Sequence, residues 1–458
     1  YKRQGVKICR CFSAFVFFCA VGFASAFHLI IYVRLKSFNR LIPLNKSYIF
    51  ASTLSNNSLS YIEMKKSYLA LGAALLLCSP FQGMAKGEEG YKFKTIVSQK
   101  VTPVKNQAST GTCWCFATTS FFEAELLRMG KGEYDLSEMF IVRQKYMNQL
   151  ADNFLRRGRG NIGEGSITSS WITAFNQVGI VPEEVYTGIN YNSDRHNHSE
   201  LTDYIEAIGD MAVKRRSESE QYKQLVNSLF DIYLGKLPEK FTYKGKEYTP
   251  KSFGESLGIN TDDYVKLTSF THKPYYREME IEIPDNWEHD RMYNLPLDEL
   301  MEAMNHTLES GYTLCWDGDV SEKGFSFTNG VAINPEVEKE EDLSASDMAR
   351  WGQMSTVSRL QEVFQFKRPY PEVKVTPEVR QIGYETFKTT DDHLMHVTGL
   401  AKDQNGTIYY ITKNSWGTER NGFGGYLNMS ESYVRAKTIY VMMHKDSLTP
   451  ALRKKLGL

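Results

Sequence analysis

The pattern of apolar and polar positions divides the chain into a helix-rich first part and a strand-rich last third. Over residues 113–128, apolar side chains recur every three to four positions, which predicts a helix that Gly130 and Gly132 end. Pro182 follows a later predicted helix, over 167–178, and prevents it from continuing. Comparable patterns predict further helices over 135–155, 167–178, 221–234 and 297–310.

From Thr313 onward the apolar positions alternate as in strands. Asn405-Gly406 is a typical two-residue hairpin turn between two of these segments. The tail, 449–458, is predicted to be a short basic helix. Helices followed by a sheet predict an α+β fold with a helical lobe and an antiparallel β-sheet lobe. The clearest strands are predicted over 393–401, 407–413 and 425–429.

Two apolar stretches lie near the N-terminus. Residues 11–33 are almost wholly apolar and long enough to span a bilayer. A second pattern begins at Met64, with two lysines, a short apolar stretch and a small-residue cleavage motif. These features predict a signal peptide over residues 64–85 that is cut before Lys86.

Two interpretations of residues 1–63 remain open. Either they are a true extension with a membrane anchor, or Met64 is the natural start and 1–63 is a non-native upstream extension. We favour the second, because a secretory signal acts at the N-terminus of a nascent chain. Export to the periplasm or out of the cell is then expected. Cys78 is a weaker candidate for lipid attachment, because the bulky Leu77 precedes it.

Charge and cysteine content narrow the function classes. Lys+Arg and Asp+Glu both total 54, so net charge points to neither nucleic acid nor a membrane surface as partner. The Arg/Gly-rich loop 156–165 is accordingly interpreted as solvated. After Lys86 only Cys113, Cys115 and Cys315 remain, which cannot form a disulfide framework. An exported domain that keeps free thiols usually uses one chemically. No cluster has metal-ligand spacing, so no cofactor is expected.

Cys113 is the predicted nucleophile. It follows the Gly111-Thr112 turn and opens a helix, where free N–H groups and the helix dipole are expected to lower its pKa. Six residues earlier, Gln107 can donate its amide N–H to an oxyanion, with the backbone N–H of Cys113 as a second donor. Cys115 is expected to pack in the core, and Cys315 lies in an apolar strand and should do the same.

A thiolate also needs a base and an orienting partner for that base. The segments DDHLMHVTGL, 391–400, and KNSWG, 413–417, supply both. His393 is the predicted base, Asn414 the residue that holds its ring, and Trp416 the cover over their hydrogen bond. His396 is the rival base, but side chains three apart on a strand face opposite sides, so only one of the two can reach the sulfur.

These segments closely resemble the papain superfamily of cysteine peptidases. VTPVKNQ with GTCW resembles its oxyanion-glutamine and nucleophile segment, and KNSWG with GGYL its asparagine segment. Asp392-His393, six residues before Gly399, resembles its histidine strand. The family places the histidine about 130–150 residues after the cysteine, whereas His393 lies 280 positions after Cys113. A large insertion, predicted as helical over about 185–300, explains the difference.

Segments within and after the insertion resemble the bleomycin hydrolase, or aminopeptidase C, subfamily. The likeness covers about residues 95–445 and implies a papain-like fold, peptide substrates, aminopeptidase activity and assembly into a hexameric barrel. The segments are IYLGKLPEKFTY at 232–243, YTPKSF at 248–253, DDYVKL at 262–267, YNLPLDEL at 293–300 and CWDGDV at 315–320.

The subfamily also has a paired-glycine substrate wall, which corresponds here to Gly165 and Ser166. Trp114 and Asp392, beside the nucleophile and the base, are further predicted substrate contacts. The subfamily's C-terminal arm lies in the cleft and binds the substrate amine, but KKLGL at the end of this sequence falls about a dozen residues short of such an arm. Two alternatives therefore stay open: an endopeptidase with an open cleft, and a non-catalytic peptide-binding relative.

Overall fold

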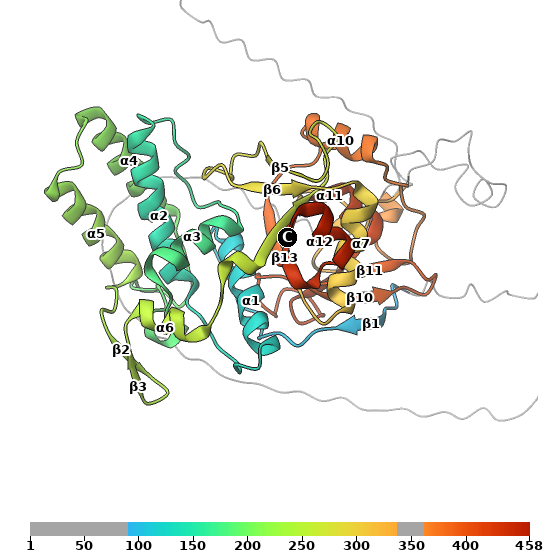
Figure 1. Ribbon diagram of the computed structural model, residues 1–458, viewed down its shortest axis with the longest axis horizontal. Coiled ribbons are helices and arrows are strands. Elements are labelled where there is room, and N and C mark those ends of the chain that lie inside the picture. Colours follow the sequence, from blue (N-terminus) through green and yellow to red (C-terminus); the bar gives the residue numbers. More distant parts are fainter. Residues whose placement is uncertain (1–89, 337–360) are drawn as a thin grey trace, which may run out of the picture. The chain divides into compact units, whose positions relative to one another are not determined.

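The computed structural model describes residues 90–336 and 361–458 (Figure 1). The predicted upstream extension, the signal peptide over 64–85 and Cys78 lie outside the described residues. Among the residues described, none of the helices is both long and apolar enough to cross a membrane. The mixture of helices and one large sheet is the predicted α+β fold.

Three helices follow the N-terminal strand and form the helical lobe with part of the insertion (Figure 1). They are α1 (Cys113–Arg128), α2 (Glu138–Leu155) and α3 (Thr168–Val178), each starting within three residues of its predicted position. The Ser137 hydroxyl caps α2 by accepting from the N–H of Phe140. Phe122 of α1 stacks on Trp171 of α3 with ring centroids 4.2 Å apart, so α1 is held from the helical side.

The insertion is only half helical, which corrects the prediction for 185–300. Its first half packs against α2, where Phe230 stacks on Tyr146. Its second half supplies strands to the main sheet. The insertion contains η1 (Glu183–Val185), α4 (Ser199–Arg215), α5 (Glu220–Leu234), β2 (Phe241–Tyr243), β3 (Lys246–Tyr248), α6 (Pro250–Leu257), η2 (Thr261–Asp263), β4 (Tyr264–Thr268), β5 (Arg277–Glu280) and β6 (Arg291–Asn294).

The main sheet has 11 strands in the order β5-β6-β4-β13-β7-β10-β11-β12-β9-β8, with β1 paired to β10. It is mixed rather than antiparallel as predicted, because β4 pairs with β6, and β12 with β9, in parallel. The remaining bounds are β1 (Lys94–Ser98), β7 (Leu314–Gly318), β8 (Phe325–Ser326), β9 (Val331–Ala332), β10 (His393–Lys402), β11 (Ile408–Lys413), β12 (Tyr426–Ser430) and β13 (Thr438–His444).

Strand β10 lies between two hydrophobic cores, and the side chains on its two faces pack into different ones. Leu394 packs in the cluster around α1, whereas Met395 packs in the cluster on the opposite face. The predicted hairpin joins β10 to β11 at Asn405-Gly406. Gly399 is required where β1 crosses β10, since a Cβ there would lie 2.2 Å from the carbonyl oxygen of Val97.

Helices also pack on the sheet face away from α1. The last helix places Leu452 and Leu456 in that core, and Lys455 forms an ion pair with Glu299 of α7 at 2.8 Å. The backbone N–H of Leu458 bonds back to its own helix. These described C-terminal residues therefore pack on α7. These elements are α7 (Leu297–Glu309), α11 (Glu431–Lys437), η4 (Lys445–Ser447) and α12 (Pro450–Leu456). Helix α10 (Pro377–Glu385) instead packs Tyr384 against Phe270 of the core around α1, with ring centroids 4.3 Å apart.

Candidate active site

The loop before α1 is tied down by short hydrogen bonds, so Cys113 starts the helix from a fixed position. The Thr112 side chain shares a 2.6 Å hydrogen bond with that of Thr110. The amide Nε2 of Gln107 donates to the Thr110 carbonyl at 2.8 Å. Cys113 is partly exposed, whereas Cys115 is buried. Only the first thiol of α1 is therefore accessible to a substrate.

Gln107 is joined to the segment that follows β11. Its Oε1 accepts from the Ser415 hydroxyl at 2.6 Å, and its backbone N–H donates to the Ser415 carbonyl at 2.8 Å. One N–H of the carboxamide is used by the Thr110 carbonyl, which leaves the other N–H for a further acceptor. The predicted glutamine is thus held in a single orientation.

His393 and Asn414 meet because the register of β10 with β11 brings their ends together. His393 Nε2 lies 2.8 Å from Asn414 Oδ1, and both residues are buried. The backbone N–H of Ser415 donates to the same oxygen at 2.7 Å, which fixes the carboxamide with Oδ1 toward the ring. Nε2 must then carry the proton, so the lone pair of the neutral ring is on Nδ1. The Trp416 ring covers the imidazole, with centroids 4.8 Å apart.

The thiol and the imidazole are both neutral in the free protein. Burial raises the pKa of Cys113 to about 12; the backbone N–H of Leu394 lowers that pKa, and the Asp391 carboxylate raises it. Burial also lowers the pKa of His393 to about 4, against the opposing effect of its hydrogen bond to Asn414. The backbone N–H of Trp114 at the helix N-terminus lowers the thiol pKa as expected, but desolvation outweighs it. The partial exposure of Cys113 lets water moderate the desolvation.

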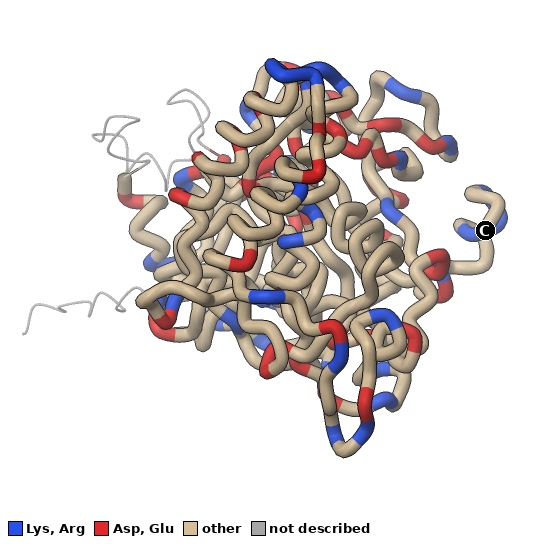
Figure 2. Tube along the Cα trace, turned by 90° about the vertical axis from the view of Figure 1, so that its left-hand side faces the viewer, with Lys and Arg blue, Asp and Glu red and all other residues tan. Residues whose placement is uncertain are grey.

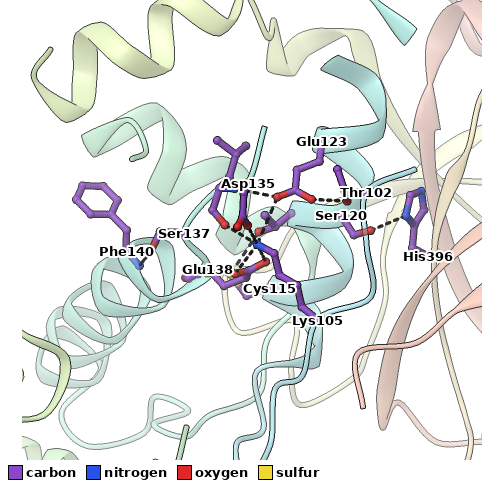
Figure 3. A network of polar contacts seen from close by, with 12 residues as sticks. Thr102, Lys105, Cys115, Ser120, Glu123, Asp135, Ser137, Glu138, Phe140 and His396 are labelled. Atoms are coloured by element: carbon purple, nitrogen blue, oxygen red, sulfur yellow. Dashed lines mark hydrogen bonds and ion pairs between the residues drawn. The ribbon is translucent and has the colours of Figure 1, made fainter. Parts of the chain in front are cut away.

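His396 faces the opposite side of β10 from the His393–Asn414 pair. Its Nδ1 shares a 2.8 Å hydrogen bond with the Ser120 hydroxyl of α1, which also accepts from Lys413 Nζ at 2.7 Å (Figure 3). His396 is fully buried in this network. It therefore ties α1 to the sheet, and the structure keeps it away from the His393–Asn414 pair, as the strand alternation predicted.

The same region contains a partly buried ion cluster that the sequence did not indicate. Lys105 Nζ lies 2.9 Å from Glu138, 2.6 Å from Asp135 and 3.4 Å from Glu123 (Figure 3). Because Lys105 is two residues before Gln107, the cluster anchors the oxyanion segment to α1 and α2. The sequence shows only that Lys105 lies in the VTPVKNQ motif. The motif does not indicate which acidic residues the lysine pairs with.

Buried side chains fix the backbone of the predicted substrate wall, Gly165 and Ser166, and of the residues just before it. The Trp114 indole is fully buried and donates to the Glu164 carbonyl at 3.0 Å, and Lys145 Nζ donates to the carbonyl of Gly163 at 2.6 Å. Ser166 is also buried, and its hydroxyl accepts from Trp287 Nε1 at 2.9 Å. The side chains of Trp114 and Ser166 therefore position the wall and do not face a substrate.

A short piece of the insertion lies across this wall, although no sequence pattern indicated it. We call residues 284–287 the insertion strap. A Cβ added to Gly165 would lie 2.2 Å from Asp285 Oδ2, so the Asp285 carboxylate is in contact with the Gly165 backbone. The strap is fastened at both ends, by Asn161 Nδ2 to the Pro284 carbonyl at 2.7 Å and by Trp287 to Ser166.

Comparisons with known proteins decide the family. The model for papain family cysteine proteases matches residues 92–259, and the model for the peptidase C1-like family matches residues 377–457. The chain belongs to the papain family of cysteine peptidases. Aminopeptidase C of Streptococcus thermophilus is 24% identical to the peptidase over 397 residues, covering 76% of this chain and 81% of the relative.

Other relatives and one solved structure agree. Mitochondrial cysteine proteinase 1 of Saccharomyces cerevisiae is 21% identical over 410 residues, covering 79% of each chain. The crystal structure of PepW from Lactobacillus rhamnosis aligns with a TM-score of 0.58 at 18% identity, covering 80% of the peptidase and 84% of PepW. The fold and the aminopeptidase C subfamily are therefore as the sequence motifs predicted.

Three acidic residues near the predicted catalytic base, His393, differ in their exposure to solvent. Asp392 is exposed and accepts from the Val320 N–H at 2.8 Å, so this predicted substrate contact points along the loop. The Asp391 carboxylate helps raise the pKa of the Cys113 thiol, and Asp317 is fully buried in β7. Within residues 90–336 and 361–458, no three His, Cys, Asp or Glu side chains could hold a metal ion.

Proposed function

We propose that the peptidase cleaves peptide bonds with Cys113 as nucleophile and His393 as general base and acid. On substrate binding, the thiol proton passes to Nδ1 of His393, and the thiolate attacks the scissile carbonyl. The imidazolium then gives that proton to the leaving amine, which departs as the acyl-enzyme forms. His393 next takes a proton from water, and the resulting attack releases the acid and restores the thiol.

Two further groups are assigned supporting roles. Asn414 holds the ring of His393 so that Nδ1 stays free, which is supported by the 2.8 Å contact at Nε2. Gln107 and the backbone N–H of Cys113 stabilise the oxyanion of the tetrahedral intermediate. The fixed orientation of the Gln107 carboxamide, set by Ser415 and Thr110, supports this role, because a preorganised donor costs no reorganisation.

We propose that the activity is that of an aminopeptidase, and one observation carries this proposal: Asp285 occupies the space against Gly165. In a papain-like endopeptidase the substrate chain upstream of the cleaved bond runs along this wall. Here the Asp285 carboxylate lies against Gly165, which supports a cleft that accommodates one residue before the scissile bond. The similarity to enzymes named aminopeptidase C agrees.

A pair of reporters tests the proposal: alanyl-aminomethylcoumarin and its N-acetylated form, assayed with the wild-type protein and with Cys113→Ser. We expect kcat/KM of the wild type to favour the free amine, and we expect Cys113→Ser to turn over neither reporter. Preference for the acetylated reporter, or for longer N-blocked peptides, would favour an endopeptidase. Absence of turnover of any peptide by folded wild type would favour the non-catalytic binding relative.

Export and assembly are also proposed. Export is supported by the sequence of residues 64–85, and N-terminal sequencing of exported protein should find Lys86 first. Homo-oligomer formation, with a hexamer as the expected form, is supported only by subfamily resemblance. Sedimentation equilibrium of the purified protein should give a mass six times that of the chain. A role in nucleic-acid binding is not proposed, because both charge signs are interspersed over the face drawn in Figure 2.

A further inference from the structure

The loop over residues 107–113 carries both proposed oxyanion donors, and the insertion holds its middle. We call these residues the oxyanion loop. The backbone N–H of Ser109 donates to the carbonyl of His196 at 3.1 Å, and the N–H of His198 donates to the Ser109 carbonyl at 3.3 Å. The centre of the oxyanion loop is therefore fixed to the insertion by two backbone hydrogen bonds.

A single carboxylate holds the end of the oxyanion loop that leads into α1. Oε2 of Glu164 accepts from the backbone N–H of Gly111, and Oε1 accepts from the hydroxyl of Thr202 in α4 at 3.3 Å. A Cβ added to Gly111 would lie 2.9 Å from the Cβ of Glu164, so the loop backbone and this side chain are in direct contact. Glu164 therefore joins the turn before Cys113 to the insertion.

The peptide group between Thr110 and Gly111 connects Glu164 to the predicted oxyanion glutamine. Its N–H donates to the Glu164 carboxylate, and its carbonyl accepts from Nε2 of Gln107 at 2.8 Å. Because a peptide group is planar, its N–H and its carbonyl turn together. The carboxylate that fixes the N–H therefore also fixes the carbonyl that orients the Gln107 carboxamide.

The backbone of Glu164 is fixed independently of its side chain. The Glu164 carbonyl accepts from Trp114 Nε1 at 3.0 Å and from Lys145 Nζ at 3.1 Å, and both donor residues are buried. The next residue is Gly165 of the substrate wall. A shorter side chain at position 164 would therefore release the oxyanion loop, while these two hydrogen bonds keep the wall in place.

We propose that Glu164 is a positioning residue of the peptidase, whose carboxylate orients the peptide group 110–111 and through it the Gln107 donor. This inference rests on the cysteine peptidase function proposed above and holds for an aminopeptidase and an endopeptidase alike. Gln107 stabilises an oxygen that becomes negative only as the thiolate attacks, so its orientation matters in the transition state and not for substrate binding. Loss of the Glu164 carboxylate should therefore lower kcat and leave KM almost unchanged.

The test compares Glu164→Ala and Glu164→Gln with a matched control, Glu206→Ala, which removes an exposed carboxylate one turn after Thr202 in α4. The kcat and KM of each are measured with alanyl-aminomethylcoumarin. We expect Glu164→Ala to lower kcat by about tenfold, a part of the roughly hundredfold that a whole oxyanion donor supplies. Glu164→Gln should restore kcat to within about threefold of wild type, because its amide can still accept from Gly111 and donate to Thr202. Glu206→Ala should match wild type.

A double-mutant cycle shows whether Glu164 acts through Gln107. In Gln107→Ala the donor that Glu164 orients is gone, so adding Glu164→Ala should lower kcat by less than about threefold. A full tenfold loss in that background would show that the carboxylate acts independently of Gln107, and the proposal would be wrong. Should Glu164→Ala not fold, Glu164→Asp takes its place in the same cycle, because it withdraws the carboxylate from Gly111 by one methylene.

Alkylation of Cys113 separates positioning from a damaged nucleophile. Iodoacetamide needs no oxyanion donor, so its rate of reaction with Cys113 should be the same in wild type and Glu164→Ala. An equal loss of alkylation and of peptide turnover would refute the positioning role. If wild type cleaves no peptide, the peptidase function itself fails; if wild type is active and Glu164→Ala retains the full kcat, only the role of Glu164 is wrong.

Discussion

Removing the carboxamide of Asn414 tests how the base is held. In Asn414→Ala, Nε2 of His393 loses an acceptor 2.8 Å away in a buried site. The ring is charged while the acyl-enzyme forms, so the lost bond is one to a charged group and is worth about 1.5–3 kcal/mol. At about 1.4 kcal/mol per tenfold change, kcat/KM should fall by about 10- to 150-fold.

The pH dependence gives this prediction a second readout. The hydrogen bond from Asn414 raises the pKa of His393, so its removal lowers that pKa further below about 4. A lower pKa makes the imidazolium harder to form, and activity on the basic side needs the imidazolium beside the thiolate. The variant should therefore lose more activity at pH 8 than at pH 6 relative to wild type.

Asn414→Asp is the matched control. It keeps an oxygen toward the ring and changes only Nδ2, which donates to no described residue. A carboxylate beside the ring favours its charged form and raises the pKa of His393. We expect activity within tenfold of wild type and a basic limb that extends to higher pH.

The assay is kcat/KM for the alanyl reporter from pH 5 to 9, normalised by titrating Cys113 with a thiol-directed epoxide. Thermal unfolding of each variant shows whether the fold survives. Two results would refute the reasoning. One is an Asn414→Ala enzyme within threefold of wild type, and the other is an equal loss in both variants, because an acceptor at residue 414 would then be irrelevant to the reactive state.

The same contacts support three further predictions. Gln107→Ala should lower kcat by about a hundredfold with little change in KM. Ser415→Ala, which frees the Gln107 carboxamide, should lower kcat by a smaller factor. Equal kcat values in wild type and Gln107→Ala would count against an oxyanion role. Among the three cysteines that the structure describes, iodoacetamide should label only Cys113 in folded protein and all three after unfolding, read by peptide mass spectrometry; labelling of a buried cysteine first would contradict the structure. His396→Gln should keep activity, because His396 bonds to Ser120 in the middle of α1 and takes no part in the His393–Asn414 contact. Burial lowers the pKa of His396 well below its usual value, so the neutral ring stabilises the fold above about pH 6.5 and this contribution is lost as pH falls. The difference in unfolding free energy between wild type and His396→Gln should therefore shrink by about 1.4 kcal/mol per pH unit below that point, measured with urea; parallel curves would refute it.

Sequence reasoning worked best where the signal was local. Cys113 at a helix start, His393 at a strand start and Asn414 after a strand were all evident from short motifs, and strand alternation separated His393 from His396. The same reasoning misjudged the pKa of Cys113, because a helix N-terminus is visible in a sequence whereas the burial of a side chain is set by the whole fold.

It failed where distant segments meet. Trp287 and Ser166 are 121 residues apart, and no pattern in either segment predicts their hydrogen bond. Strands β4 to β6 were missed. In β5 and β6 the exposed positions carry charges that obscure the period of two, and in β4 nearly every position is buried. Trp114 and Ser166 were assigned to substrate contact by position alone, but both side chains turn inward.

These contacts change the explanation of how the cleft is limited. From the sequence, the choice between exopeptidase and endopeptidase depended on a C-terminal arm, yet the described C-terminal residues pack on α7 by Leu452 and Leu456. We propose that the insertion strap supplies the barrier instead, because it is fastened to the wall at two points and Asp285 contacts Gly165. A stop built from an internal segment does not depend on the chain end entering the cleft.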